Sequence, residues 1–337
     1  PAVDRVRACR FPAFDRSLRR PGRMNEARAR VIALLRAFET ARALRGERFD
    51  AAVVLVADYW AAAVTALAGI PVRAGLAGGG AQRFLTHVVE QPALPVGKLA
   101  PAEDVEHVAA SQLRVARRLL SLSDREPAPT FDARTAYEPT AADRADAARL
   151  WRKHELEKAS GVAVIHPTPG AAAKRWPNER FAIVADHLSG RLGATVMLTG
   201  GPDDVDDVRD IAARCVRKPI DLAGQTSFGA LAALFDRARL AIGPDNGAMH
   251  LATARGLPAL RLFGPTDAQV WGGWAGDQPS PPSLTSPRVC SPCHRLDLPD
   301  WGSVPGARGD VYPCLADLTV DAVIEAVEHL WRESDGR

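Results

Sequence analysis

The chain has 337 residues, of which 47% are hydrophobic and 25% charged, and its net charge is +3. This length exceeds one ordinary core and fits two domains, and the composition matches soluble globular proteins, which excludes disordered and fibrous classes. Five cysteines in so long a chain imply no disulfide framework and favour a reducing, cytoplasmic compartment.

The beginning of the chain is strongly basic, because residues 1–48 contain thirteen arginines against five acidic residues. Such a block attracts the phosphates of a nucleic acid, an anionic membrane face or an anionic substrate. An arginine-rich coding bias on a solvated helix explains it equally well. The opening PAVDRVRACRF is typical of a continuing strand and loop rather than a targeting segment, so we expect further residues upstream.

The first half predicts a helix, strand, helix and strand at residues 24–46, 49–56, 59–68 and 72–76, and a later helix at 103–120. The most apolar run, residues 51–72, is interrupted by Asp58 and ends near Gly69 and Pro71, so it falls short of a membrane span. Residues 123–139 are rich in Pro, Ser, Thr and charge, which is typical of a linker.

The second half alternates helices and strands. After a helix at 141–158, strands are predicted at 162–166, 194–200, 220–222, 240–243 and 258–263, with helices between them. This alternation predicts a parallel, doubly wound sheet that binds ligands at the carboxyl ends of its strands. We therefore predict one domain at 1–140, a second at 141–317, and a final helix within 318–337 that is capped by Thr319 and crosses back to the first domain.

The loop after strand 162–166 reads HPTPGAAAKRWP. The Thr168 hydroxyl and the Lys174 cation, beside a strand end, suit a diphosphate, and Lys174 would neutralise charge on a leaving group. Trp176 is expected to pack beneath this loop. The alternative is an ordinary surface lysine on a turn.

The next two loops read TGGPDD and LAGQT. In the first, Asp203 or Asp204 can accept hydrogen bonds from ribose hydroxyls, although both can equally cap the following helix. In the second, Gln225 and Thr226 are candidates for lining a base pocket.

The fourth loop, GPDNGAMHL, is the most informative because it runs from a strand directly into a helix. Exposed N–H groups at that helix start form an anion site supported by the helix dipole, and His250, one turn later, can donate to the same phosphate. A structural role for the histidine is the alternative. The candidate residues are Asp245, Asn246, Gly247, Ala248, Met249 and His250.

A cysteine-rich stretch follows. Cys290, Cys293, His294 and Cys314 offer three sulfurs and one imidazole, which is enough for a tetrahedral zinc site in principle. Their spacing is irregular, and we favour reduced structural cysteines without a metal.

The succession IHPTPGAAAKRWP, TGGPDD, DLAGQTS, GPDNGAMHLATARGLP and RLFGPTDAQVW resembles the C-terminal half of the bacterial ADP-heptose:lipopolysaccharide heptosyltransferases over about residues 160–275. The resemblance implies an α/β GT-B fold, in which two Rossmann-like doubly wound domains face a cleft. It also implies inverting transfer from a nucleotide sugar, with no cofactor required.

The resemblance assigns roles to individual residues. The turn from Asp245 to His250 would hold the donor's phosphates and sugar, and Thr168 and Lys174 would contact the diphosphate and sugar. Asp203 or Asp204 matches a ribose-binding carboxylate, and Thr266 a possible donor contact. Lys174 and His250 would stabilise the leaving group electrostatically, normally the largest catalytic contribution.

One departure from the family pattern concerns the base. The family's N-terminal Gly-Asp loop, which carries the presumed base, does not occur before residue 50, and Asp58 is a weak substitute. Loss of a base would lower the rate by about 10²- to 10⁴-fold.

We therefore predict transfer of a sugar from a nucleoside-diphosphate sugar, with ADP-heptose as the leading candidate, to an anionic lipopolysaccharide-core glycolipid. Peripheral contact with the inner membrane face is expected, and a nucleic acid partner is not. One alternative is a non-catalytic nucleotide-sugar-binding module. Another is a nicotinamide-dependent oxidoreductase, which is disfavoured because no Gly-x-Gly-x-x-Gly motif opens any of these helices.

Overall fold

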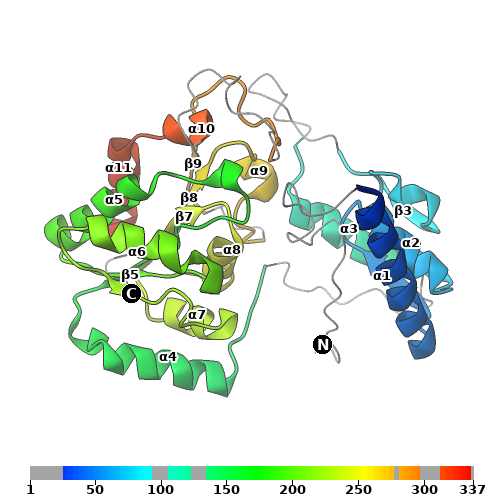
Figure 1. Cartoon of the computed structure of the whole chain (residues 1–337), viewed down its shortest axis with the longest axis horizontal. Coiled ribbons are helices and arrows are strands. Elements are labelled where there is room, and N and C mark those ends of the chain that lie inside the picture. Colours follow the sequence, from blue (N-terminus) through cyan, green and yellow to red (C-terminus); the bar gives the residue numbers. More distant parts are fainter. Residues whose placement is uncertain (1–25, 93–104, 123–133, 277–280, 297–311, 335–337) are drawn as a thin grey trace. The chain divides into compact units, whose positions relative to one another are not determined.

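The computed structural model describes residues 26–92, 105–122, 134–276, 281–296 and 312–334. The chain divides into two compact units, shown in Figure 1. Unit 1 comprises residues 1–92 and 108–131, and unit 2 comprises residues 93–107 and 132–337. The predicted domain boundary at residue 140 stays a prediction, and the contact division falls nearby, between residues 131 and 132.

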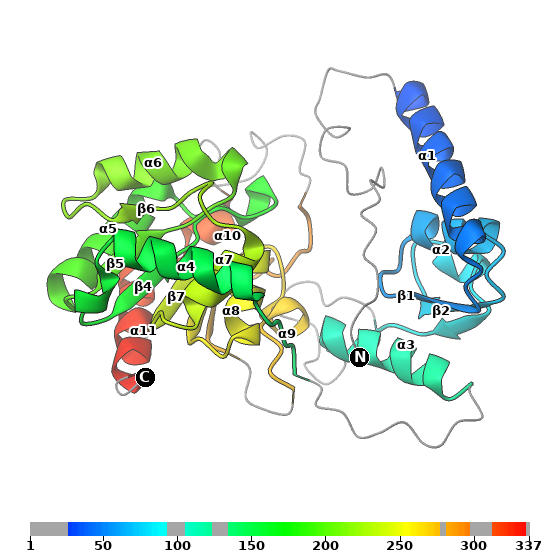
Figure 2. The ribbon, with the colours of Figure 1, turned by 90° about the horizontal axis from the view of Figure 1, so that it is seen from below.

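Unit 1 contains a three-stranded parallel sheet in the order β1-β2-β3, formed by β1 (Ala51–Val54), β2 (Val72–Leu76) and β3 (His87–Val89). Helices α1 (Glu26–Glu47) and α2 (Tyr59–Leu67) pack together through a small core of alanines with Val64 and Ile70. Helix α3 (Val108–Leu120) packs against the strands, with Val115 buried on β2. Figure 2 shows α3 on the opposite side of the strands from α1 and α2.

Unit 2 contains a six-stranded sheet in the order β6-β5-β4-β7-β8-β9, with every neighbouring pair parallel. The strands are β4 (Val162–Ile165), β5 (Thr195–Leu198), β6 (Ile220–Asp221), β7 (Leu240–Pro244), β8 (Ala259–Phe263) and β9 (Ser283–Thr285). Successive strands are added outward from β4 through β5 to β6 on one side, and from β7 through β8 to β9 on the other. The carboxyl ends of β4 and β7 therefore form a topological switch point, where doubly wound sheets bind their ligands.

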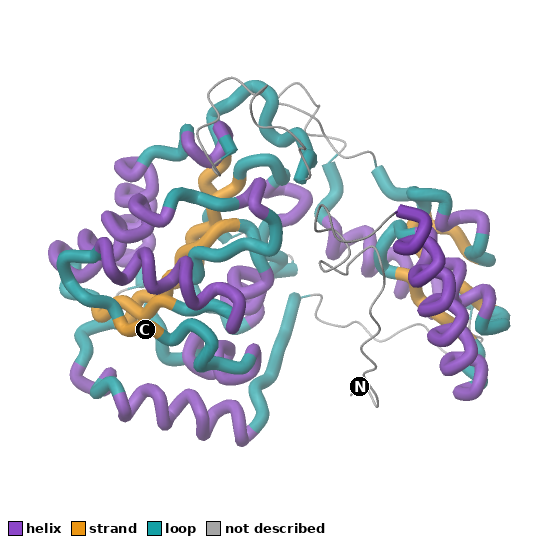
Figure 3. Tube along the Cα trace, in the orientation of Figure 1, coloured by secondary structure: helices purple, strands orange, loops and turns teal. Residues whose placement is uncertain are grey.

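Helices cover both faces of this sheet, as Figure 3 shows. The helices of unit 2 are α4 (Ala141–Lys153), α5 (Asn178–Arg191), α6 (Val205–Arg214), α7 (Phe228–Phe235), α8 (Gly247–Ala254), α9 (Ala268–Trp271), α10 (Pro313–Ala316) and α11 (Val320–Glu333). One core layer includes residues of α5, α6 and α11, and the other includes residues of α4, α7 and α8. The inner strands β4, β5, β7 and β8 are almost entirely buried, which explains their largely apolar sequences.

The final helix, α11, packs against α5 within unit 2. Thr319 caps it as predicted, its hydroxyl accepting a hydrogen bond from the Ala322 amide. Trp331 lies over Gly161, where an added Cβ would come within 2.8 Å of the indole ring. Among the described helices, none is long and apolar enough to cross a membrane.

Candidate functional site

Asn246 organises the turn between β7 and α8. Its side-chain oxygen accepts a hydrogen bond from the Met249 amide at 3.0 Å, and its side-chain nitrogen donates to the Thr168 carbonyl at 3.3 Å. The first interaction caps α8, and the second ties that cap to the loop after β4. The predicted helix start is therefore present, but the Met249 N–H is already used by the cap. The first-turn amides of Gly247 and Ala248 remain as the anion donors of this turn.

Asp245 contacts three side chains from separate segments at the carboxyl edge of the sheet. Its Oδ2 accepts from Lys174 Nζ at 2.9 Å and from Thr266 Oγ1 at 3.0 Å, and His250 Nε2 lies 3.7 Å from its Oδ1. The Asp245 side chain is 7% exposed and that of Lys174 is 16% exposed. Burial opposes ionisation of Asp245, but its interactions with His250, Lys174 and Thr266 hold the carboxyl pKa below its ordinary value. Asp245 is therefore the anion that positions the Lys174 cation and lies beside His250.

Two further side chains line the β4 side of this turn. The Thr168 hydroxyl is buried and has no hydrogen-bond partner in the described part of the chain, so it can donate to or accept from a ligand. His166 is the residue just before that loop, and its Nδ1 lies 3.0 Å from Thr199 Oγ1. Burial lowers the pKa of His166 to about 4, so the imidazole is neutral at physiological pH.

The carboxylates after β5 have separate surroundings. Asp204 accepts a hydrogen bond from the Gly201 amide at 2.8 Å, which matches the capping alternative, whereas Asp203 is exposed. The Gly224 amide donates to the Gly200 carbonyl at 2.9 Å and brings the loop after β6 beside this one. On that loop, the Gln225 side-chain nitrogen donates to the Asp221 carbonyl, so this hydrogen bond holds the conformation of the loop. Thr226 is half-buried next to it.

Asp58 has a structural role within unit 1. Its Oδ1 accepts a hydrogen bond from the Ala61 amide at 2.8 Å and caps α2. This cap accounts for a carboxylate just after β1 without any catalytic function. Among the described residues of unit 1, this cap is the side-chain hydrogen bond of Asp58, and its role as a base stays a prediction.

Sequence reasoning missed two residues beside the turn. Arg261, in the middle of β8, is completely buried, and its Nη2 donates to the Met249 carbonyl at 2.5 Å and to Thr253 Oγ1. His107 lies 3.1 Å, through Nε2, from the Gly272 carbonyl and packs its ring on Trp274 at 4.8 Å between centroids. The arginine was detectable as the single charge within the apolar strand ALRLF. The histidine had no local signal.

The cysteine-rich stretch supports the segment that carries Thr266. The amides of Cys293 and His294 both donate to the Pro265 carbonyl, at 3.0 and 2.7 Å. Burial, and to a smaller extent the neighbouring Cys293, raises the pKa of the Cys314 thiol to about 12, so this thiol stays protonated. Among the described residues, no three His, Cys, Asp or Glu side chains are grouped as metal ligands. The predicted Zn alternative for Cys290, Cys293, His294 and Cys314 therefore has no support in the structure.

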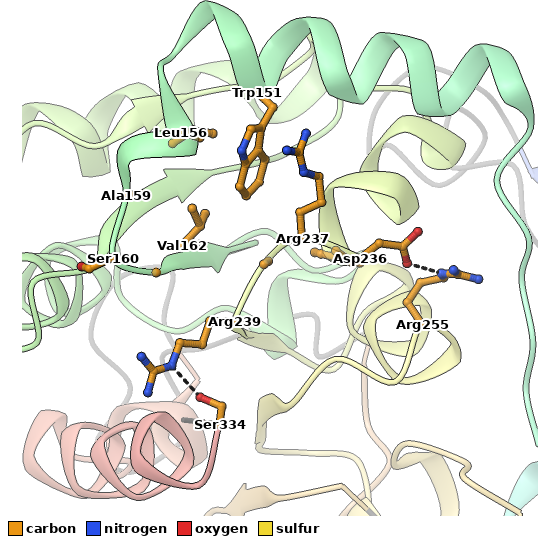
Figure 4. Close-up of a pocket in the computed structure, with 13 residues that line it drawn as sticks. Trp151, Leu156, Ala159, Ser160, Val162, Asp236, Arg237, Arg239, Arg255 and Ser334 are labelled. Atoms are coloured by element: carbon orange, nitrogen blue, oxygen red, sulfur yellow. Dashed lines mark hydrogen bonds and ion pairs between the residues drawn. The ribbon is translucent and has the colours of Figure 1, made fainter. Parts of the chain in front are cut away.

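A cavity of about 540 Å³ lies at the opposite edge of the sheet, near the beginnings of β4 and β7. Figure 4 shows Trp151, Arg237 and Arg239 among its lining residues. The Arg237 guanidinium stacks on the Trp151 ring at 4.5 Å, and Arg239 Nε donates to Ser334 Oγ at 2.9 Å. None of the predicted site residues lines this cavity, so it is distinct from the turn around Asp245.

The sequence matches a family model. The model of glycosyltransferase family 9 (heptosyltransferase) matches residues 37–295. Lipopolysaccharide heptosyltransferase 3 of Escherichia coli K12 is 44% identical over 132 residues, which cover 37% of this chain and 38% of that protein. Lipooligosaccharide heptosyltransferase 2 of Haemophilus ducreyi is 28% identical over 207 residues, covering 58% of this chain and 55% of that protein. The chain thus aligns with little more than a third of the first of these relatives and about half of the second.

Solved structures show the same fold. A glycosyl transferase family 9 protein of Veillonella parvula is 22% identical, covers 93% of this chain and 81% of its own, and superposes with a TM-score of 0.62. The ADP-heptose lipopolysaccharide heptosyltransferase II of Escherichia coli is 19% identical, with coverages of 90% and 82% and a TM-score of 0.62. An Escherichia coli heptosyltransferase solved with ADP is 17% identical, with coverages of 89% and 78% and a TM-score of 0.53. The predicted α/β GT-B class is confirmed by these likenesses.

Proposed function

The chain belongs to glycosyltransferase family 9, the heptosyltransferases, and from this premise we propose that it transfers a sugar from a nucleoside-diphosphate donor to a glycan. The proposed donor is ADP-heptose, and the proposed acceptor is a lipopolysaccharide-core or similar anionic glycolipid. Transfer proceeds with inversion at the anomeric carbon. No cofactor is required in this proposal.

The arrangement around Asp245 is the single observation that carries the proposal. Lys174, Thr266 and His250 come from separate segments and meet at one carboxylate beside the first turn of α8. A lysine ammonium has three N–H donors, and the bond to Asp245 uses one of them. The others, together with the Gly247 and Ala248 amides, can hold a diphosphate at the switch point of the sheet.

These groups act on the charge that develops during transfer. The acceptor hydroxyl attacks the anomeric carbon while the bond from that carbon to the diphosphate oxygen breaks, and negative charge accumulates on the leaving nucleotide. Lys174 and His250 are held next to that charge before the reaction begins, because Asp245 orients both. Preorganised donors of this kind stabilise the transition state without reorganisation. The base that accepts the hydroxyl proton is left unassigned.

The remaining donor contacts follow from the same edge of the sheet. Thr168 offers its unpartnered hydroxyl to the diphosphate or sugar. In the proposal, exposed Asp203 rather than the capping Asp204 contacts the ribose, and the Gln225 and Thr226 loop lines the base pocket. The choice of an adenine nucleotide is supported by the relative that was solved with ADP.

The acceptor would place the reaction at the cytoplasmic face of the inner membrane. Helix α1 exposes Leu34, Leu35 and Phe38 on the same helix as the exposed cations Arg42 and Arg45. Apolar side chains with flanking arginines suit peripheral contact with an anionic lipid surface. No observation favours the predicted alternative of a non-catalytic binding module.

Calorimetry with ADP, UDP and NAD, followed by a transfer assay with ADP-heptose and a core-glycolipid acceptor, tests the proposal. We expect saturable ADP binding, weaker UDP binding and no NAD binding. Lys174→Met should weaken ADP binding by about 10- to 100-fold, whereas Lys218→Met, whose ammonium binds the carbonyls at the end of α6, should leave it unchanged. Tight NAD binding without ADP binding would overturn the proposal, and ADP-sugar binding without turnover would favour the binding module.

A further inference from the structure

Arg261 is a charged side chain in the interior of unit 2. It is 0% exposed, and its neighbours in β8, Leu260 and Leu262, belong to the apolar core on the other face of the sheet. Among the described residues, the guanidinium is hydrogen-bonded through one of its three nitrogens, Nη2, and both acceptors belong to α8. Nε and Nη1 have no partner within the described ranges of the chain. A buried guanidinium with open donors is unfavourable unless another charge compensates it.

Among the described residues, two cations act on one carboxylate around the start of α8. Lys174 and Arg261 are both cations, and Asp245 is the carboxylate whose charge acts on each of them. Asp245 already pairs with Lys174 and Thr266 through Oδ2. Burial lowers the pKa of Arg261 to about 10, with Asp245 opposing the shift, so the guanidinium remains charged at pH 7. In the described part of the chain, the one Asp245 carboxylate is therefore shared between two cations.

Water is kept from this guanidinium by the segment after α9. At Gly273, an added Cβ would lie 2.8 Å from the Arg261 carbon Cζ and 2.7 Å from Thr253 Oγ1. The absence of a side chain at this glycine lets the backbone pack directly against the arginine. A charge that is shielded from water in this way acts strongly over several ångströms, because the local dielectric constant is low.

We propose that Arg261 is a positioning residue for the donor diphosphate, acting through its charge and its hold on the first turn of α8 without touching the ligand. This inference rests on the proposed function, because it requires a nucleoside diphosphate at the α8 start. In the free protein Arg261 is a poorly compensated buried cation. A bound diphosphate supplies the missing negative charge, so the arginine favours the liganded state at the expense of the unliganded one.

The test compares two ligands that differ in charge. Calorimetry is done with ADP and with adenosine on the full chain and on Arg261→Met, Arg261→Lys and Arg261→Gln. We expect Arg261→Met to weaken ADP binding by about 10- to 100-fold and adenosine binding by less than about twofold. Arg261→Lys should stay within about fivefold of the parent for ADP. Arg237→Met removes the same charge at the opposite edge of the sheet and should change neither affinity.

Thermal unfolding without ligand separates this role from a structural one. Replacing a poorly compensated buried cation by an apolar side chain of similar size should leave Tm unchanged or raise it by up to about 4 °C. A large fall in Tm, with equal losses for ADP and adenosine, would show a purely structural role and overturn the inference. If Arg261→Met does not fold, Arg261→Gln carries the same expectation for ADP against adenosine.

The outcomes distinguish the inference from the function beneath it. If the parent protein fails to bind ADP, the proposed donor site itself is wrong. If the parent binds ADP and the neutral Arg261 variants bind it within about twofold, the donor site stands and the role of Arg261 is refuted.

Discussion

Replacing Lys174 by methionine removes one partner of the ion pair that centres the site. The Lys174 and Asp245 atoms are 2.9 Å apart, and the Asp245 side chain is 7% exposed. At an effective dielectric constant of about 20 the direct attraction at this distance is about 6 kcal/mol, most of which offsets the desolvation of the two charges. Removing only the lysine leaves a buried carboxylate without its main cation, for which losses of about 3 to 5 kcal/mol are typical. Because Thr266 and His250 still contact Asp245, we expect a loss of about 3 kcal/mol in the free energy of unfolding.

A double-mutant cycle isolates the pair. Asp245→Asn should cost about 1 to 2 kcal/mol, since it keeps the Thr266 contact and Lys174 can extend toward solvent. The double variant should be more stable than the sum of the single losses predicts, by about 1 to 2 kcal/mol. Urea unfolding followed by tryptophan fluorescence suits this measurement, because Trp151, Trp176 and Trp331 are all buried in unit 2. A Lys174→Met loss below about 1 kcal/mol, or strict additivity of the two substitutions, would refute the reasoning.

Three further outcomes are expected. His166 has a pKa of about 4 in the folded protein and 6.5 when unfolded, so its contribution to the free energy of unfolding should be complete above pH 6.5. About 3 kcal/mol of that free energy should be lost as the pH falls from 6.5 toward 4. Urea titrations at several pH values should show this pH dependence, and it should be weaker in His166→Asn. Thr168→Val should leave the free energy of unfolding unchanged or raise it by up to about 1 kcal/mol, because the lost hydroxyl has no partner among the described residues, yet calorimetry should show ADP bound about tenfold more weakly. Gly264→Ala places a Cβ 1.6 Å from Leu315 Cδ2 and 2.9 Å from Cys314 Sγ. This overlap should lower the free energy of unfolding by about 1 to 3 kcal/mol, which thermal unfolding measures. An unchanged Tm would contradict the close packing of Gly264 against Leu315.

Much of unit 2 was predictable because its sequence signals are local. The apolar strand 162–166, the helix from residue 141 and the turn at Asn246 each have a clear signal in their own residues. The structure places the corresponding elements at β4, α4 and the start of α8. Trp176 also packs as predicted, buried beneath its loop with Nε1 donating to the Leu318 carbonyl. In each case the residues within a short window decide the conformation.

The failures arise where distant segments decide the outcome. No sequence signal indicated that His107 groups with unit 2, because its partner Gly272 is far away in sequence. Met249 was expected to offer its amide to a ligand, but the Asn246 side chain takes that amide, a detail set by cap geometry. The burial of Arg261 was not predicted, because the apolar pattern of a strand does not show which face of the sheet a single charged residue occupies. The roles of the candidate donor residues remain predictions.

The packing of Trp331 over Gly161 has a consequence for synthesis on the ribosome. The first strand of unit 2 is made early, yet the helix that completes one side of its core begins only at Val320, well after β8 ends at Phe263. At about 5 to 20 residues per second, that interval lasts about 3 to 11 s. During it, the apolar face that α11 later covers is open to chaperones and to other nascent chains. Docking of α11 therefore ends the exposure of this apolar face.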